Sequence, residues 1–349
     1  MRAIMKHRLF WPVVALLALI AINTIARPQF ILVTVRNGEL YGALIDILRN
    51  SAPLMLVALG MTIVIATRGI DLSVGAIMAV SGAVALTIID GSSDPGNLGT
   101  VLVALVVALV VSLVLGVWNG FLVAVVGIQP IIATLVLMLA GRGVALLITE
   151  GFITTVNSEP YEFIATGYLL ALPFAFLIWV IAVVLIALFE RRTALGVLTE
   201  AVGINPEASR LAGVRARGIV FGAYVLSGFL AGVAGIIYSS NIRAADANAA
   251  GLFIELYAIL AVVLGGTSLM GGKFTIAGTV IGVLTIQTLE ATILFLGVPS
   301  AQSPVFFAIV VIVVVLVQSP RLHRWARGAV RSAGARTRAD AGSRTGVAS

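Results

Sequence analysis

The sequence has no cysteine and only two histidines, His7 and His323. Without cysteine the chain forms no disulfide and has no thiolate nucleophile or metal ligand. Both histidines lie in basic terminal segments, away from the apolar body of the chain. A zinc site and a histidine-based catalytic relay are therefore not expected. We expect no catalytic residues, no metal and no cofactor.

Charge is also scarce, since charged residues make up 11% of the chain against about 25% in soluble domains. Apolar residues make up 60%, and the mean hydropathy is +1.14. The apolar runs are continuous rather than alternating, and several reach the ~20 residues that cross a bilayer as a helix. The sequence therefore predicts an all-α integral membrane protein. The net charge of +7 comes from residues at span ends and in the tail, which indicates contact with anionic lipid rather than nucleic acid.

Ten transmembrane helices are expected, with eight or nine as alternatives because the second and eighth runs are the weakest. Pro130 and Pro304 open two of them, and the eighth is short enough to be part of a broken helix. The runs cover residues 9–26, 52–67, 72–89, 98–126, 130–148, 168–189, 218–238, 252–264, 274–296 and 304–318.

The distribution of basic residues predicts that both termini are cytoplasmic. Of the 22 Lys and Arg residues, 17 fall in segments that this assignment places inside and four in segments that it places outside, while Arg142 lies within a span. The resulting organisation is a cytoplasmic N-terminus (1–8), a transmembrane permease domain (9–318) and a basic, partly disordered cytoplasmic tail (319–349).

The segment 190–217 is the most charged part of the chain interior and has five arginines. Asn205 suits a helix N-cap, Pro206 the first helical position and Gly213 the C-terminal stop, so a short capped helix is expected here. Such a helix in a basic cytoplasmic loop is a surface that another protein could bind. A solvated surface helix without a partner explains the pattern equally well.

Two motifs resemble functional loops and fail on inspection. The run GGTSLMGGKFT resembles a phosphate-binding loop, but Thr267 and Phe274 stand where that loop needs Gly and Ser or Thr. The run IDLSVG resembles a nucleophile elbow, but Asp71 replaces the first glycine. The G-x-x-x-G pairs predict close helix packing, which does not by itself indicate a dimer.

Polar side chains at apolar positions are candidates for a translocation path, because a charge at mid-bilayer costs about 2.5–3.5 kcal/mol on insertion scales. For Asp71 an N-cap role is the preferred alternative, and the others could be satisfied inside the bundle. Arg142 is expected to snorkel or to pair with a carboxylate such as Glu150. The candidate path residues are Asp71, Asn119, Glu255, Gln287 and Glu290.

Four stretches resemble the permease subunits of bacterial ATP-binding-cassette sugar importers, the ribose, xylose and galactose permease family. They are GMTIVIATRGIDLSVGAIMAVSG (60–82), IATLVLMLAGRGVALLI (132–148), EAVGINPEASRLAGV (200–214) and AILAVVLGGTSLMGGKFTIAGTVIG (258–282). The resemblance covers residues 44–318, and the segment 242–266 is similar to the galactofuranose branch. Arg68 departs from the family, which commonly has glycine at this place.

The resemblance implies a non-enzymatic subunit of the inner membrane that imports a monosaccharide, a pentose or hexose such as galactofuranose. It implies a second permease copy or paralogue, cytoplasmic ATPase subunits and a periplasmic sugar-binding protein. It also implies that the segment 190–217 contains the coupling helix. The residues expected to couple to the ATPase are Asn205, Pro206, Glu207, Arg210 and Gly213.

Three alternatives stay open at this point. The same architecture could import another solute, such as an autoinducer, a nucleoside or a branched-chain amino acid. An ion-coupled secondary transporter would work without an ATPase, although no chain of acids crosses the predicted membrane region. A structural membrane protein would transport nothing. The sequence does not name the solute.

Overall fold

The computed structural model describes residues 9–297 together with Val305, Ala308, Ile309 and Ile312. The chain divides into two units, Met1–Ala291 and Thr292–Ser349. The predicted tenth span, the N-terminus and the basic tail lie largely or wholly outside the described residues. The first unit contains all of the elements below except the end of the last helix.

The described part of the chain is mostly helical, with three short antiparallel two-stranded sheets, β1–β2, β3–β6 and β4–β5. The strands are β1 Thr34–Arg36, β2 Glu39–Tyr41, β3 Thr154–Thr155, β4 Tyr168–Leu169, β5 Leu172–Pro173 and β6 Ala244–Ala245. The helices are α1 Phe10–Ala26, η2 Pro28–Ile31, α2 Ala43–Asn50, α3 Ala52–Ala66, α4 Val74–Asp90, α5 Leu98–Gly120, the π-helical η3 Phe121–Val126, α6 Pro130–Ile148, α7 Glu159–Thr166, α8 Phe174–Arg192, α9 Ala194–Ile204, α10 Pro206–Leu211, α11 Ala216–Ile242, α12 Ile254–Leu264 and α13 Ile276–Phe295.

Five described helices are long and apolar enough to cross a membrane: α5 with η3, α6, α8, α11 and α13. A sixth results if α2 and α3, which are bent by 46° at their junction, form one span. The apolar helices α1, α4, α9 and α12 are shorter. The structure is thus consistent with an all-α membrane protein, while the count of ten spans stays a prediction.

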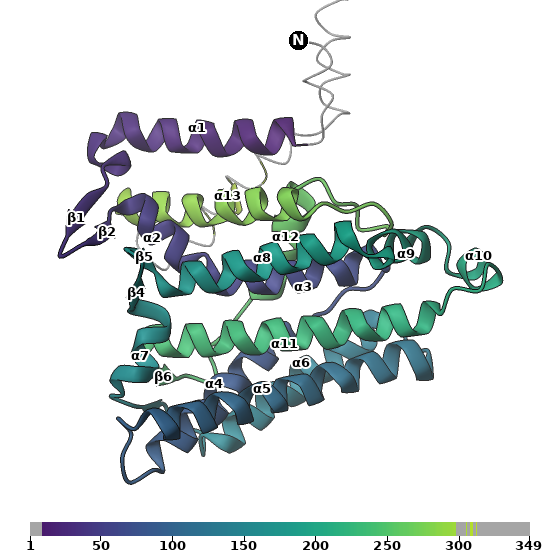
Figure 1. Ribbon diagram of the computed structural model, residues 1–349, viewed down its shortest axis with the longest axis horizontal. Coiled ribbons are helices and arrows are strands. Elements are labelled where there is room, and N and C mark those ends of the chain that lie inside the picture. The colour runs from purple at the N-terminus through teal and green to yellow at the C-terminus, as the bar shows by residue number, and fades with distance from the viewer. Residues whose placement is uncertain (1–8, 298–304, 306–307, 310–311, 313–349) are drawn as a thin grey trace, which may run out of the picture. The chain divides into compact units, whose positions relative to one another are not determined.

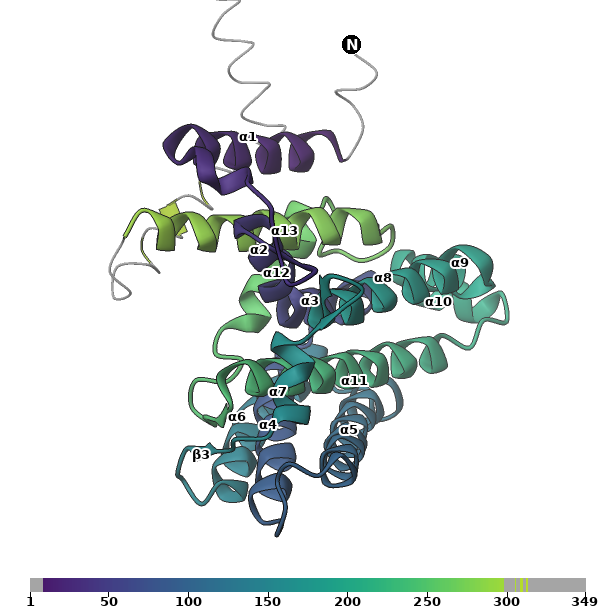
Figure 2. The same ribbon diagram turned by 60° about the vertical axis from the view of Figure 1, so that its left-hand side comes forward.

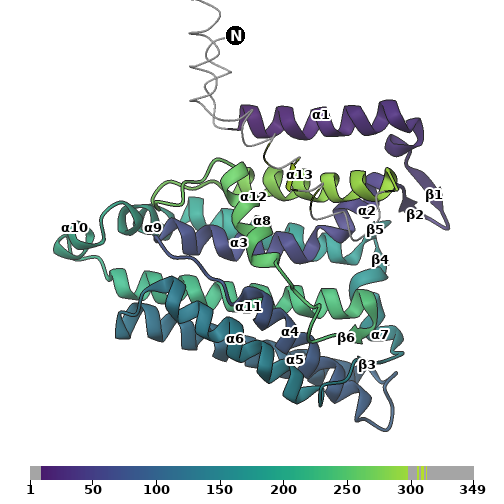
Figure 3. The same ribbon diagram turned by 180° about the vertical axis from the view of Figure 1, so that it is seen from behind.

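Helix α11 is the centre of the first unit and packs against α3, α4 and α5 (Figures 1 and 3). Its close contacts depend on small residues. A Cβ atom added to Gly228 would lie 2.6 Å from the Cα of Gly116 on α5, and one added to Gly235 would lie 2.3 Å from the carbonyl oxygen of Met78 on α4. The predicted glycine face therefore packs the bundle of a single subunit.

Helix α3 has only 15 residues but is buried on all sides, and only Pro53 and Ile63 are not fully buried. Longer neighbours cover it, so its apolar residues contact protein rather than lipid. Helix α6 packs on α4, and α12 packs on α3. This arrangement buries Asp71, in the loop after α3, in the interior of the unit.

Several sequence-based boundaries need correction. The sixth span was expected to begin at Tyr168, but Tyr168 and Leu169 pair with Leu172 and Pro173 in a hairpin, and the helix begins at Phe174. The predicted charged loop also contains an 11-residue apolar helix, α9, whose N-cap Thr193 accepts a hydrogen bond from the amide of Leu195. The predicted polar loop 149–167 contains α7.

Helices α9 and α10 lie at one end of α11, and α7 lies at the other (Figure 2). We call these the α10 end and the α7 end of the bundle.

Candidate functional site

Helix α10 begins at the residues that the sequence predicted. The Asn205 Oδ1 atom accepts hydrogen bonds from the amides of Glu207 (3.1 Å) and Ala208 (3.0 Å). Pro206 occupies the first turn, where a backbone N–H has no partner within the helix, so its absence in proline costs no hydrogen bond. The N-cap prediction is therefore confirmed as local structure.

The C-terminus of α10 is closed by Gly213, which has a φ angle of +84°. The amide of Gly213 donates to the Arg210 carbonyl (3.0 Å), and the amide of Val214 donates to the Ser209 carbonyl (3.0 Å). These two bonds form a Schellman motif, in which glycine takes the left-handed conformation without strain. Caps at both ends let a helix of six residues hold its shape, although such a short helix is marginal in isolation.

The outer surface of α10 is exposed and carries an ion pair. The Arg210 guanidinium donates to the Glu207 carboxylate from two nitrogens, at 2.6 and 3.2 Å. The hydrogen bonds from Arg210 hold the pKa of Glu207 below its ordinary value. Leu211 beside them is 76% exposed. The helix thus presents a charged pair and an apolar side chain at its surface.

An apolar cavity of about 1010 Å³ lies between α8, α9 and α11. Its walls come from α8, α9, the segment 212–215 and the first turns of α11. Phe189, Leu195, Arg215 and Phe274 are among the lining residues. The cavity thus separates α8 and α9 from the first turns of α11, next to the segment that follows α10.

A buried polar cluster surrounds Asp71 in the turn between α3 and α4. The Asp71 carboxylate accepts hydrogen bonds from the amide (3.0 Å) and hydroxyl (2.6 Å) of Ser73 and from the Ser227 hydroxyl on α11 (2.8 Å). The Asn119 side chain on α5 donates to the Ser73 hydroxyl (2.7 Å). Asp71 and Asn119 are both fully buried. The cluster therefore joins the α3–α4 turn to two other helices.

The alternative role of Asp71 as an N-cap is corrected by this geometry. The N-cap of α4 is Ser73, and Asp71 lies two residues earlier, where its carboxylate closes a local turn. Sequence reasoning missed Ser227 and Tyr224. The Tyr224 hydroxyl and the Asn119 Oδ1 atom are two of the six buried side-chain atoms that have no hydrogen-bond partner among the described residues. Such atoms are uncommon in proteins and mark a place where a polar group could bind.

The other three path candidates occupy different positions. Glu255 is buried at the start of α12, and a Cβ atom added to Gly75 in the first turn of α4 would lie 2.9 Å from its carboxylate. Gln287 donates to Glu290 within α13 (2.9 Å), and Glu290 is exposed. Within the part of the chain that is described, no hydrogen bond joins this pair to Asp71. The structure thus gathers Asp71, Asn119 and Glu255 near the beginning of α4.

Arg142 does not pair with Glu150, as was one expectation. Its guanidinium donates to the backbone carbonyls of Ala247 (2.8 Å) and Ala250 (2.5 Å) in the segment before α12. These bonds satisfy carbonyl groups of an irregular segment in the protein interior.

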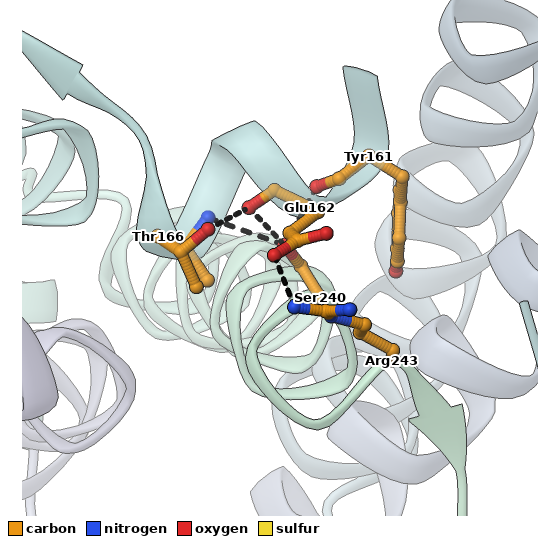
Figure 4. Close-up of polar contacts among 6 residues, drawn as sticks. Tyr161, Glu162, Thr166, Ser240 and Arg243 are labelled. Carbon is orange, nitrogen blue, oxygen red and sulfur yellow. Dashed lines mark hydrogen bonds and ion pairs between the residues drawn. The ribbon is translucent and has the colours of Figure 1, made fainter. Parts of the chain in front are cut away.

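The α7 end carries a second polar cluster, which fastens α7 to the end of α11 (Figure 4). The Ser240 hydroxyl donates to the Tyr161 carbonyl (2.6 Å) and accepts from the amide of Ala165 (3.1 Å). Arg243 forms an ion pair with Glu162. The hydroxyl of Tyr161 is within 2.6 Å of the Ser239 hydroxyl, and burial raises the pKa of Tyr161. These contacts make α7 a fixed cover on this end of α11.

These features define a polytopic helical membrane protein with a buried polar centre and an exposed, capped helix at one end. Residues 43–315 match the family model described as branched-chain amino acid transport system / permease component. The chain therefore belongs to this family of permease components, and it is a transporter subunit of the inner membrane rather than an enzyme.

Curated relatives align over nearly the whole chain. The galactofuranose transporter permease protein YtfT of Escherichia coli (strain K12) is 48% identical over 337 residues, which cover 94% of this chain and 95% of the relative. The fructose import permease protein FruF of Bifidobacterium longum (strain NCC 2705) is 42% identical, with 92% and 90% covered. The ribose import permease protein RbsC of Escherichia coli (strain K12) is 38% identical, with 88% and 92% covered. No solved structure matches the chain.

Proposed function

We propose that this chain is the permease subunit of an ATP-binding-cassette importer and forms the path of a monosaccharide, with galactofuranose as the first candidate. The observation that supports this most is the 48% identity to a galactofuranose permease across 94% of the chain. The relatives named for fructose and ribose support the same class of solute. The family description names branched-chain amino acids instead.

The proposed partners are a separate ATPase, a periplasmic sugar-binding protein and a second permease copy or paralogue. We place the α10 end, both termini and the tail 319–349 in the cytoplasm, because the arginines of the segment 190–217 gather there. Asn205, Pro206 and Gly213 shape the coupling helix, and Glu207 and Arg210 form its contact surface. ATP binding would close the ATPases and shift α10, and α11 would transmit this motion to the bundle.

For the path we propose Asp71, Asn119 and Glu255 as the inner group, with Gln287 and Glu290 on α13 as further candidates. The buried polar atoms of Asn119 and Tyr224 support this assignment, because sugar hydroxyl groups can both donate and accept hydrogen bonds. Three hydrogen bonds already hold Asp71, so it orients its neighbours rather than offering a free carboxylate.

The first experiment is to purify the tagged chain from its native membrane and to identify the proteins that accompany it by mass spectrometry. We expect an ATPase subunit that is lost when residues 205–213 are replaced by a Gly-Ser linker of equal length. A chain that purifies alone and still transports solute into vesicles without ATP would refute the importer proposal in favour of a secondary transporter.

The second candidate solute is a branched-chain amino acid, because the family description names this class. Uptake of labelled galactofuranose, ribose, fructose and leucine by the reconstituted importer with its own binding protein separates the two. Leucine uptake without sugar uptake would replace the sugar proposal while leaving the importer architecture intact.

A further inference from the structure

Arg68 lies just beyond α3 in a left-handed backbone conformation, with a φ angle of 67°. The amide of Arg68 donates to the Ile65 carbonyl (2.9 Å), and the amide of Gly69 donates to the Val64 carbonyl (2.9 Å). This is a Schellman motif, and Arg68 occupies the position that glycine takes most easily. Because the backbone here favours glycine, the role of the residue has to be sought in its side chain.

The Arg68 side chain bonds to two segments that are distant in sequence. Its terminal nitrogen Nη2 donates to the carbonyl of Ile204, and Nε donates to the carbonyl of Met270 (3.2 Å). Ile204 is the last residue of α9 and directly precedes Asn205, the N-cap of α10. Met270 belongs to the loop between α12 and α13. One guanidinium therefore holds the beginning of α10 and the α12–α13 loop together.

The backbones of these three segments also meet directly below Arg68. The amide of Gly272 donates to the Ala66 carbonyl (2.9 Å). A Cβ atom added to Gly203 would lie 1.8 Å from the Ala66 oxygen, and one added to Gly271 would lie 2.4 Å from Cγ of Arg68. The ends of α3 and α9 and the glycine-rich loop thus touch with no side chain between them, and the stem of Arg68 covers the junction.

We propose that Arg68 is a positioning residue that carries the displacement of α10 to the α3–α4 turn and to the α12–α13 loop. This inference rests on the proposed function, in which α10 binds an ATPase. Helices α9 and α11 adjoin α10 along the chain and follow its motion by connectivity. Within the described residues, the side-chain hydrogen bonds that join the end of α9 to the α12–α13 loop are those of Arg68.

The path from Arg68 into the centre of the bundle is short. Asp71 follows three residues later, and its carboxylate is bonded to Ser227 on α11. A displacement of Arg68 is therefore transmitted to the buried polar cluster through a turn that is held at both ends by hydrogen bonds. Without the guanidinium, only the backbone contacts among Ala66, Gly203 and Gly272 would join the ends of α3 and α9 to the α12–α13 loop, so the loop would follow α10 less closely.

The test uses the complete importer, reconstituted in proteoliposomes with its ATPase and binding protein, and measures solute transported per ATP hydrolysed. Arg68→Gly removes the guanidinium at a position where glycine is unstrained, so the variant is expected to fold. We expect its transport-to-ATP ratio to fall about tenfold, with ATPase association unchanged. Arg68→Lys should be intermediate, because a compact ammonium does not reproduce the fork of donors of arginine. Arg191→Ala, which removes an exposed charge from the last turn of α8, is the matched control and should match wild type.

A distance measurement distinguishes positioning from a purely structural role. Because the chain has no cysteine of its own, Ala208→Cys and Leu269→Cys provide two unique labelling sites at exposed positions. In wild type we expect the distance between the labels to be the same with and without nucleotide, and in Arg68→Gly we expect it to change when ATP binds. A structural role alone would lower the yield of complex and leave this distance constant.

A failure of this inference and a failure of the proposed function give different experimental results. If Arg68→Gly retains the wild-type ratio and a constant distance while the ATPase still binds through α10, the role of Arg68 is refuted and the coupling helix stands. If the wild-type chain binds no ATPase through α10, co-purification shows it before any Arg68 variant is made, and both proposals fall.

Discussion

Replacing Asn205 with alanine should weaken the binding of the ATPase by loosening the first turn of α10. The side chain of Asn205 caps two amides, those of Glu207 and Ala208. Loss of such a cap costs about 1 kcal/mol, within a range of about 0.5–2 kcal/mol. Since 1 kcal/mol corresponds to roughly a fivefold change in an equilibrium constant, the folded fraction of this marginal helix falls by up to about fivefold. If the ATPase binds only the folded helix, its apparent dissociation constant rises by the same factor.

The assay is titration of the purified ATPase onto the permease in lipid nanodiscs, with three substitutions at this one position. Asn205→Asp keeps a good cap and should bind as wild type does. Asn205→Gly costs only a few tenths of a kcal/mol at an N-cap and should remain close to wild type. Asn205→Ala should be the weakest of the three. If glycine and alanine weaken binding equally, the side chain contacts the ATPase directly and the capping argument is refuted.

Three further predictions concern packing, helix termination and charge. Gly228→Ala should lower the free energy of unfolding, measured by thermal unfolding in detergent, by about 1–3 kcal/mol, because its Cβ would meet Gly116. Its control is Gly222→Ala on the same helix, where a Cβ would have nothing within 4 Å, and this substitution should not be destabilising. Gly213→Pro should uncouple ATP hydrolysis from transport in a protein that still folds and inserts, because proline cannot adopt the φ angle of +84°, and fully coupled transport would contradict this. The pKa of Glu207, measured by NMR on the labelled carboxyl, should rise towards its ordinary value in Arg210→Gln. Because the folded-state pKa of Glu207 is depressed, the ion pair stabilises α10 above the ordinary pKa of about 4.3 and loses this effect as the pH falls through the folded-state value. A titration curve that is unchanged in Arg210→Gln would exclude the pair as the cause.

The features that sequence reasoning predicted correctly depend on neighbours along the chain. The caps of α10 follow from Asn205, Pro206 and Gly213 because capping acts over three to five residues. The long apolar helices α5, α6 and α11 follow from continuous hydrophobic runs for the same reason. Local chemistry of this kind can be read from one sequence.

The features that were missed depend on partners far away in the chain. Asp71 reaches Ser227 across 156 residues, and Arg68 reaches Met270 across 202. No periodicity or spacing encodes such pairs, because they exist only once the helices are packed. Helix α9 was missed for a different reason, since its apolar residues adjoin the charged Glu190–Arg192 segment and the whole stretch resembled a loop. A threonine N-cap at residue 193 was the available signal.

The separation of Arg68 and Asp71 by only three residues has a mechanical consequence. The turn between them is short, and its far end is bonded to α11 and, through Ser73, to α5. It therefore cannot absorb a displacement of α10 by bending freely. The α12–α13 loop turns at Gly266, Gly271 and Gly272, which all have positive φ angles, and glycine can change its backbone conformation at the least steric cost. A displacement transmitted to Arg68 should accordingly shift α3 and the start of α4 as one body, while the loop before α13 changes conformation. The motion would thereby reach α13, which carries the other two path candidates, Gln287 and Glu290.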